Sequence, residues 1–264
     1  MIIRKGISAA LLAAALSLGA SASAAQSAQT AIRPAVSGRY DADISKEVQN
    51  KLDKDRFKNV RASVNDGLVT LTGTVELFAH KHQAEDRVRD VDHVQAVSNR
   101  IEVAGKQVSD AELQEKLANK LRYDRVGQGI VFNNLSLEVR NGYATIGGSV
   151  YSEADAASAI AIAEHMPGVK GVRDEITVQP TSIVDDDLRI ALARRIYGDS
   201  MLSRYAMDPQ APIRIVVNRG KVTLHGVVSS EAEKTVAGMR ANEVPGVFAV
   251  DNQLVVANAK TAKK

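Results

Sequence analysis

The sequence predicts an α+β protein of three tandem small α-β-β-α-β domains, each a three-stranded mixed sheet packed against two helices. Two observations carry this prediction: a recurring pair of glycines around a strand, and an amphipathic helix ahead of each copy. The string "NDGLVTLTGTV" at residues 65–75 returns as "RNGYATIGGSV" at 140–150 and "NRGKVTLHGVV" at 218–228. Periods of 75 and then 78 residues indicate an array of small domains, because solenoid units are shorter.

A first helix and a hairpin are expected at the start of each copy. Apolar residues at i, i+4 and i+8 predict a helix with one buried face. They are Ile44, Val48 and Leu52; Leu113, Leu117 and Leu121; and Leu188, Leu192 and Ile196. An alternating strand follows each helix, and Asp66-Gly67 and Asn141-Gly142 are typical hairpin turns, with Arg219-Gly220 in register.

A second helix and a closing strand complete each copy. Ser152 and Ser230 are expected to begin helices that carry alanines at i, i+4. The mid-strand glycines Gly73, Gly148 and Gly226 share a face with buried residues, so we expect a helix to pass close over them. Close approach of a ligand is the alternative, because glycine also admits one.

The ends of the chain have other compositions. Residues 1–24 are predicted to be a signal peptide, with an uncleaved anchor helix as the alternative. Residues 25–40 read as a linker, 41–105, 109–180 and 181–256 as the three domains, and 257–264 as a basic tail. The mature chain has no other long apolar run, so no transmembrane span is expected in it. The absence of cysteine fits a periplasmic location.

Charge and aromatic content argue against a nucleic-acid partner. The net charge is +3 and falls to about +1 once Arg4 and Lys5 are removed with the signal peptide. The chain contains no Trp and few other aromatic residues, so a surface that stacks bases is not expected.

The repeated residues resemble those of the BON domain family. "PGVKGVRDEITV" at 167–178 and "PGVFAVDNQLVV" at 245–256 are similar to the family's closing motif, although His93 stands in the first copy where the others have glycine. The shared positions are Gly67, Gly73 and Asn99; Gly142, Gly148, Gly168 and Asp174; and Gly220, Gly226, Gly246 and Asn252. The resemblance implies a non-catalytic envelope module that binds phospholipid or protects against osmotic stress.

No catalytic, cofactor or metal site is expected. His80 and His82 face different sides of a helix, and no third ligand recurs at the matching positions. Asn99, Asp174 and Asn252 lie on the apolar face of the last strand, where a polar side chain needs partners. A structural role is favoured there over ligand binding, since a unique site would not be written three times.

Specificity is expected in unequal inserts between the first helix and the hairpin of the second and third copies. Their mixture of arginine and apolar residues suits contact with an anionic phospholipid surface or an envelope protein. The candidate contacts are Arg122, Tyr123, Arg125, Met201, Leu202, Arg204, Tyr205 and Met207. Folding of these inserts back over the small sheets is the alternative. The predicted function is therefore that of an exported, non-enzymatic phospholipid-binding envelope protein, with a periplasmic holdase or assembly scaffold as the second hypothesis.

Overall fold

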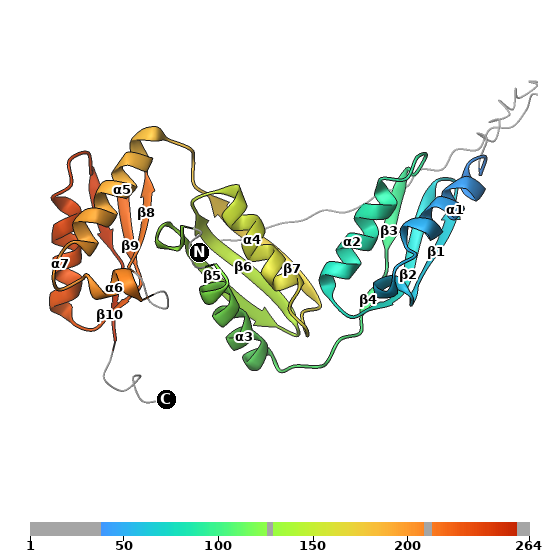
Figure 1. Cartoon of the computed structure of the whole chain (residues 1–264), viewed down its shortest axis with the longest axis horizontal. Coiled ribbons are helices and arrows are strands. Elements are labelled where there is room, and N and C mark those ends of the chain that lie inside the picture. The colour runs from blue at the N-terminus through green and yellow to red at the C-terminus, as the bar shows by residue number, and fades with distance from the viewer. Residues whose placement is uncertain (1–37, 126–128, 209–212, 258–264) are drawn as a thin grey trace, which may run out of the picture. The chain divides into compact units, whose positions relative to one another are not determined.

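A computed structural model describes residues 38–125, 129–208 and 213–257 of the chain. Residues 41–105, 109–180 and 181–256 are called units 1, 2 and 3 below. Each contains two main helices and a small mixed sheet, as expected (Figure 1). No described helix is both long and apolar enough to cross a membrane. The predicted signal peptide and most of the linker and tail lie outside the described residues.

Unit 1 shows the common order of elements. It comprises α1 (Asp41–Lys51), the 3₁₀ turn η1 (Asp55–Phe57), β1 (Val60–Asn65), β2 (Leu68–Val75), α2 (Phe78–Arg89), β3 (Ala96–Asn99) and β4 (Glu102–Val103). The central strand β2 pairs antiparallel with β1 and parallel with both β3 and β4, so the predicted strand directions are confirmed.

Units 2 and 3 repeat this order with a longer connection after the first helix. Unit 2 comprises α3 (Asp110–Tyr123), η2 (Ile130–Phe132), β5 (Asn134–Arg140), β6 (Tyr143–Val150), α4 (Glu153–Glu164) and β7 (Gly171–Val178). Unit 3 comprises α5 (Ile183–Tyr197), α6 (Arg204–Met207), β8 (Arg214–Asn218), β9 (Lys221–His225), β10 (Val227–Val228), α7 (Glu231–Asn242), β11 (Ala249–Asn252) and β12 (Val255–Val256).

Each unit has its own apolar core between its helices and one face of its sheet. The predicted helical stripes are buried, apart from the half-buried Leu52. The alanines of the second helices, Ala84, Ala159 and Ala237, are fully buried as well. Because the hydrophobic effect scales with buried apolar area, each core stabilises its own unit.

An aspartate at the start of each first helix holds the hairpin turn of the same unit. The carboxylates of Asp41, Asp110 and Asp185 each accept two backbone N–H bonds from the turn, at 2.6 to 3.0 Å. Both turn residues have positive φ in all three units, 52° for Arg219 and 74° for Gly220. The acidic residues at the helix starts therefore interact favourably with the helix dipole and also connect the first helix to the hairpin.

The structural reason for glycine at the mid-strand positions differs from the expected one. A Cβ on Gly73 would lie 2.0 Å from the carbonyl oxygen of Asn59, and one on Gly148 would lie 2.1 Å from that of Asn134. Their φ angles are +107° and +98°. The expectation that a helix requires these glycines is wrong, since the backbone leading into the neighbouring strand is what a side chain would meet.

The polar residue of the last strand joins strand to helix in two units. Asn99 Nδ2 donates to the carbonyl of Lys81 in α2 at 2.9 Å, and Asn252 Nδ2 donates to Lys234 in α7 at 2.7 Å. Each Oδ1 accepts the N–H two residues on, where the strand is interrupted. The structural interpretation is confirmed for these two. It is wrong for Asp174 as a buried residue, because Asp174 is exposed and, among the described residues, its carboxylate accepts a hydrogen bond from the N–H of Ile176 and none from a helix.

Candidate partner-binding surface

The insert of unit 2 is fastened to the start of α4 by a buried carboxylate. Arg125, only 2% exposed, donates through Nη2 to the backbone oxygen of Asp155 at 3.0 Å and to its Oδ1 at 3.1 Å. Asn133 Nδ2 and Ser152 Oγ also donate to this carboxylate. Charge pairing and hydrogen bonds together make burial of these groups tolerable.

Unit 3 uses the matching position in the same way. Glu233, at the start of α7, accepts hydrogen bonds from Arg204, from Tyr205 Oη at 2.8 Å and from the N–H of Ser229 at 2.8 Å. Glu233 is buried whereas the side chain of Arg204 is 55% exposed. The short helix α6 is thereby held against the unit's core.

Unit 1 has no acid at this position. His80 stands there, and its Nδ1 is buried without a hydrogen-bond partner among the described residues. Burial, followed by the positive charges of Arg56 and His165, lowers the pKa of His80 from its usual 6.5. A neutral imidazole thus replaces the carboxylate in the unit whose connection is shortest.

These contacts decide which predicted residues can meet a partner. Leu202 and Tyr205 are buried in the core of unit 3, so their expected surface role is wrong. Arg125 is buried as well, so its expected exposure on the surface is wrong, although it lines an internal cavity. The remaining predicted residues keep exposed surface: Arg122, Tyr123, Met201, Arg204 and Met207. Of these, Met207 is the most exposed, at 86%, and Arg204 is engaged by Glu233. The buried three pack against the second helix or the core of their own unit.

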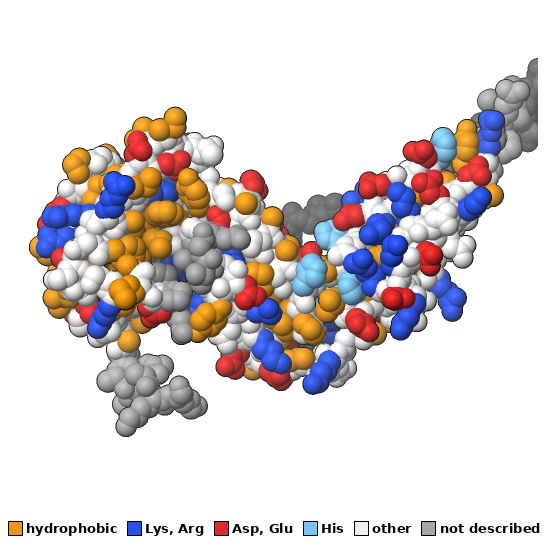
Figure 2. Space-filling view, viewed as in Figure 1, with side chains coloured by type: hydrophobic (Ala, Val, Ile, Leu, Met, Phe, Trp, Pro, Cys, Tyr) orange, Lys and Arg blue, Asp and Glu red, His pale blue; other side chains and the backbone are white. Residues whose placement is uncertain are grey.

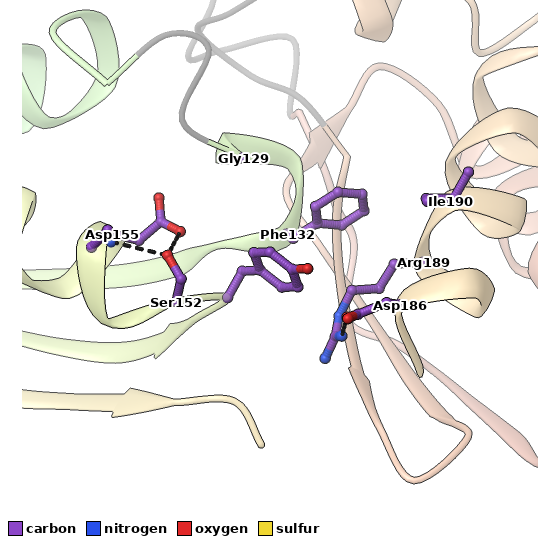
Figure 3. A pocket seen from close by; sticks show the side chains of 9 residues that line it. Gly129, Phe132, Ser152, Asp155, Asp186, Arg189 and Ile190 are labelled. Atoms are coloured by element: carbon purple, nitrogen blue, oxygen red, sulfur yellow. Dashed lines mark hydrogen bonds and ion pairs between the residues drawn. The ribbon is translucent and has the colours of Figure 1, made fainter. Parts of the chain in front are cut away.

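A groove lies where the start of α4 and η2 approach α5. Its lining residues are Gly129, Phe132, Tyr151, Ser152, Ala154, Asp155, Asp186, Arg189 and Ile190. Its volume is about 440 Å³, and Phe132 lies between Ser152 and Asp155 on one side and the α5 residues on the other (Figure 3). Small-molecule and peptide sites are typically concave and mostly apolar with a few polar groups, and the lining has this character.

A buried arginine forms one wall of this groove. Arg189 is 1% exposed and pairs with Asp186, while Nη2 donates to Gln179 at 2.8 Å and to the carbonyl of Val217 at 2.7 Å. Its guanidinium lies 5.1 Å from the ring centroid of Tyr151. The positive charge of Arg189 is therefore paired within the protein, so the groove offers mainly apolar surface to a ligand.

Exposed apolar side chains gather on unit 3. They are Ile183, Val184, Ile190, Met201, Met207, Val227, Met239, Phe248 and Val255. Unit 1, by contrast, exposes only Leu68 as a large apolar residue within its described range, with Tyr40 just before it. On the face drawn in Figure 2, apolar side chains are frequent over unit 3 and charged ones over unit 1. Ile183 and Ile190 are seven residues apart on α5, so they lie on one helix face beside the groove.

Sequence reasoning missed the residues that anchor the inserts. Asp155 and Glu233 each follow a helix-capping serine by three residues, and Ser152 and Ser230 do cap α4 and α7. An S-x-x-D or S-x-x-E spacing was the available signal for them. The groove had no such signal, because it combines residues from two units.

His225 is a second described histidine whose pKa is shifted. His225 has a pKa lowered by burial, with the nearby charge of Asp251 opposing this and that of Arg214 adding to it. Within the described ranges, no three His, Asp or Glu residues are placed to hold a metal ion.

Comparison with family models decides the family. The BON domain model matches residues 40–105, 109–180 and 199–258, which is most of the chain. The chain belongs to the BON domain family. The third match begins after α5, yet Leu188, Leu192 and Ile196 of α5 lie in the core of unit 3. The structure therefore gives all three BON domains the same first helix.

Two comparisons with solved structures show only distant likeness. CdsD, a structural protein of the type III secretion system of Chlamydia trachomatis, is 17% identical, with a TM-score of 0.24 over 83% of this chain and 95% of CdsD. The periplasmic domain of the S. typhimurium inner-membrane protein PrgH is 10% identical, with a TM-score of 0.18 over 80% and 98%. These scores are too low to support a functional comparison. A search of curated proteins found no match.

Proposed function

We propose that this chain is an exported, non-enzymatic protein of the bacterial envelope that binds phospholipid surfaces and protects the envelope under osmotic stress. Its BON domains supply the scaffold, and unit 3 supplies most of the contact surface. The observation that carries this proposal is the concentration of exposed apolar side chains on unit 3, whereas unit 1 has few of them.

The proposed binding is peripheral and weak. Single protruding side chains such as Met207, 86% exposed, and Ile183, 83% exposed, can enter the headgroup region, while arginines meet the phosphates. The net charge of the chain is small, so attraction to an anionic surface is modest and falls as salt screens it.

Vesicle co-sedimentation of residues 25–264 tests the proposal. We expect binding to phosphatidylglycerol vesicles at low salt and release at high salt. Ile183→Ser or Met207→Ser should weaken binding about threefold to tenfold, because each removes part of a buried apolar contact. Leu68→Ser, on unit 1 and 42% exposed, is the matched control and should bind like the wild type. Absence of binding at low salt would refute the proposal.

A second candidate function is a holdase or assembly scaffold, and the groove favours it. Phe132, Tyr151 and Ile190 offer an apolar surface in a concave site of about 440 Å³, which suits an apolar segment of another protein. The charges in its walls are paired, so they neither attract nor repel an acidic partner strongly.

Suppression of aggregation distinguishes the two functions. A holdase should slow the aggregation of a heat-unfolded client, and Ile190→Ser should reduce this effect while vesicle binding persists. Equal loss of both activities in Ile190→Ser would instead assign the groove to the lipid-binding surface.

A further inference from the structure

A second cavity is lined by three arginines. Arg122 comes from α3, Arg125 from the insert of unit 2, and Arg214 from β8 of unit 3. The remaining lining residues are Ala118, Leu121, Asn133, Leu135, Ser136 and Leu137. The cavity volume is about 120 Å³, and none of its lining residues is acidic.

Positive charge is in excess around this cavity. Asp155 offsets the charge of Arg125, but neither Arg122 nor Arg214 forms an ion pair within the described part of the chain. The residues outside the described ranges include no Asp or Glu, so they provide no side-chain carboxylate for either arginine. Burial, followed by the charges of Arg122 and Arg125, lowers the pKa of Arg214. Arginines without counter-ions repel one another, and a bound anion relieves this.

Arg125 also has an unused donor at this place. Its Nη2 is bonded to Asp155, but its Nε is buried with no hydrogen-bond partner among the described residues. A buried N–H that bonds to nothing costs about 1–3 kcal/mol, so native proteins usually give such a group a partner. The polar groups that line this cavity are three guanidinium groups, the amide of Asn133 and the hydroxyl of Ser136.

We infer that Arg122, Arg125 and Arg214 form a binding site for one phosphate group. Guanidinium groups present planar, charge-assisted donors that match phosphate oxygens, and several of them around one site favour phosphate. A volume of about 120 Å³ corresponds to roughly four water molecules, which suits a phosphate group but no acyl chain. If the phosphate belongs to a phospholipid headgroup, the inference rests on the proposed function. A free phosphate compound would be bound by the same chemistry.

Calorimetric titration of residues 25–264 with inorganic phosphate, at matched ionic strength in chloride, tests the site. The wild type should bind, and Arg122→Gln and Arg214→Gln should each bind about tenfold more weakly, because a charge-assisted hydrogen bond is lost. Arg122→Lys should recover part of the affinity. Arg173→Gln, which removes an arginine whose side chain is 76% exposed and lies outside the cavity, should bind like the wild type. Urea unfolding of each variant establishes that it is folded.

The outcomes separate the site from the proposed function. Equal affinity in the wild type, Arg122→Gln and Arg214→Gln, or an equal loss in Arg173→Gln, would overturn the site. Phosphate binding that needs both arginines, without any binding to phosphatidylglycerol vesicles, would support the site for free phosphate compounds and overturn the proposed function. Vesicle binding that is unchanged in both variants, with no phosphate binding, would keep the function and overturn the site.

Discussion

At the residue scale, the glycine pair that defines the repeat marks backbone geometry. The turn glycines lie in a hairpin held by an aspartate, and the mid-strand glycines Gly73 and Gly148 lie against the backbone that enters the neighbouring strand. Neither position requires a ligand. The shared glycines therefore identify the module, and they carry no information about what the module binds.

Substitution of adjacent glycines in β6 tests this explanation. Gly148→Ala should lower the free energy of unfolding of unit 2 by at least about 2–3 kcal/mol, since φ is +98° and a Cβ would meet the Asn134 carbonyl. Gly147→Ala should cost less, because its φ is not positive and the nearest atom is the hydroxyl of Ser136 at 3.1 Å. Urea denaturation measures both. Equal costs would show that a general need for small residues, and not the backbone contact, selects Gly148.

His80 makes stability depend on pH in a direction that follows from its environment. Its pKa is lower in the folded protein than the usual 6.5, so the unfolded chain takes up a proton that the folded one resists. The contribution of neutral His80 is fully present above pH 6.5 and is lost as the pH falls toward the folded pKa. Between pH 7.5 and 5 the wild type should lose more stability than His80→Gln. An identical loss in the two proteins would contradict the assignment.

At the element scale, the second helix of units 2 and 3 also anchors the insert of its unit. Asp155 and Glu233 occupy the same position after a capping serine, and each engages an arginine of the insert. The longer connections of units 2 and 3 are thus both held at the same position of the second helix. Unit 1 has His80 at that position. This explains why Arg125 and Tyr205, polar residues of the two inserts, are buried.

The two anchors should differ in strength. Asp155→Asn leaves the charge of Arg125 buried and unpaired, so we expect a loss of about 3–5 kcal/mol in the stability of unit 2. Glu233→Gln leaves Arg204, whose side chain is 55% exposed, free to reach water, so about 1–2 kcal/mol should be lost in unit 3. Hydrogen exchange of β6 and β9 reports the two units separately. A larger loss for Glu233→Gln would contradict this order.

At the scale of the whole molecule, the repeated parts were predictable and the site was not. Helical stripes such as Leu188, Leu192 and Ile196 and the Asn-Gly turn are local signals, so the element order follows from them. The groove and the arginine cavity bring together residues distant in sequence, such as Arg122 and Arg214, and no local pattern contains that proximity. The composition of the insert also gave a wrong expectation for Leu202, because its burial depends on how the insert returns to the core.

The three similar domains have different roles in the whole molecule. Units 1, 2 and 3 each have a core of the same kind and the same aspartate that holds the hairpin, but exposed apolar residues gather on unit 3. Arg122 and Arg214, which form no ion pair among the described residues, line a cavity with residues of both unit 2 and unit 3. Repetition thus supplies a scaffold, and differences between the repeats supply the binding surface.

Hydrogen exchange of the mature chain, free and bound to phosphatidylglycerol vesicles, tests this division most directly. We expect slower exchange on binding in residues 183–187 and 201–207 of unit 3, with little change in residues 60–75 of unit 1. Protection spread evenly over the three units, or confined to unit 1, would contradict it.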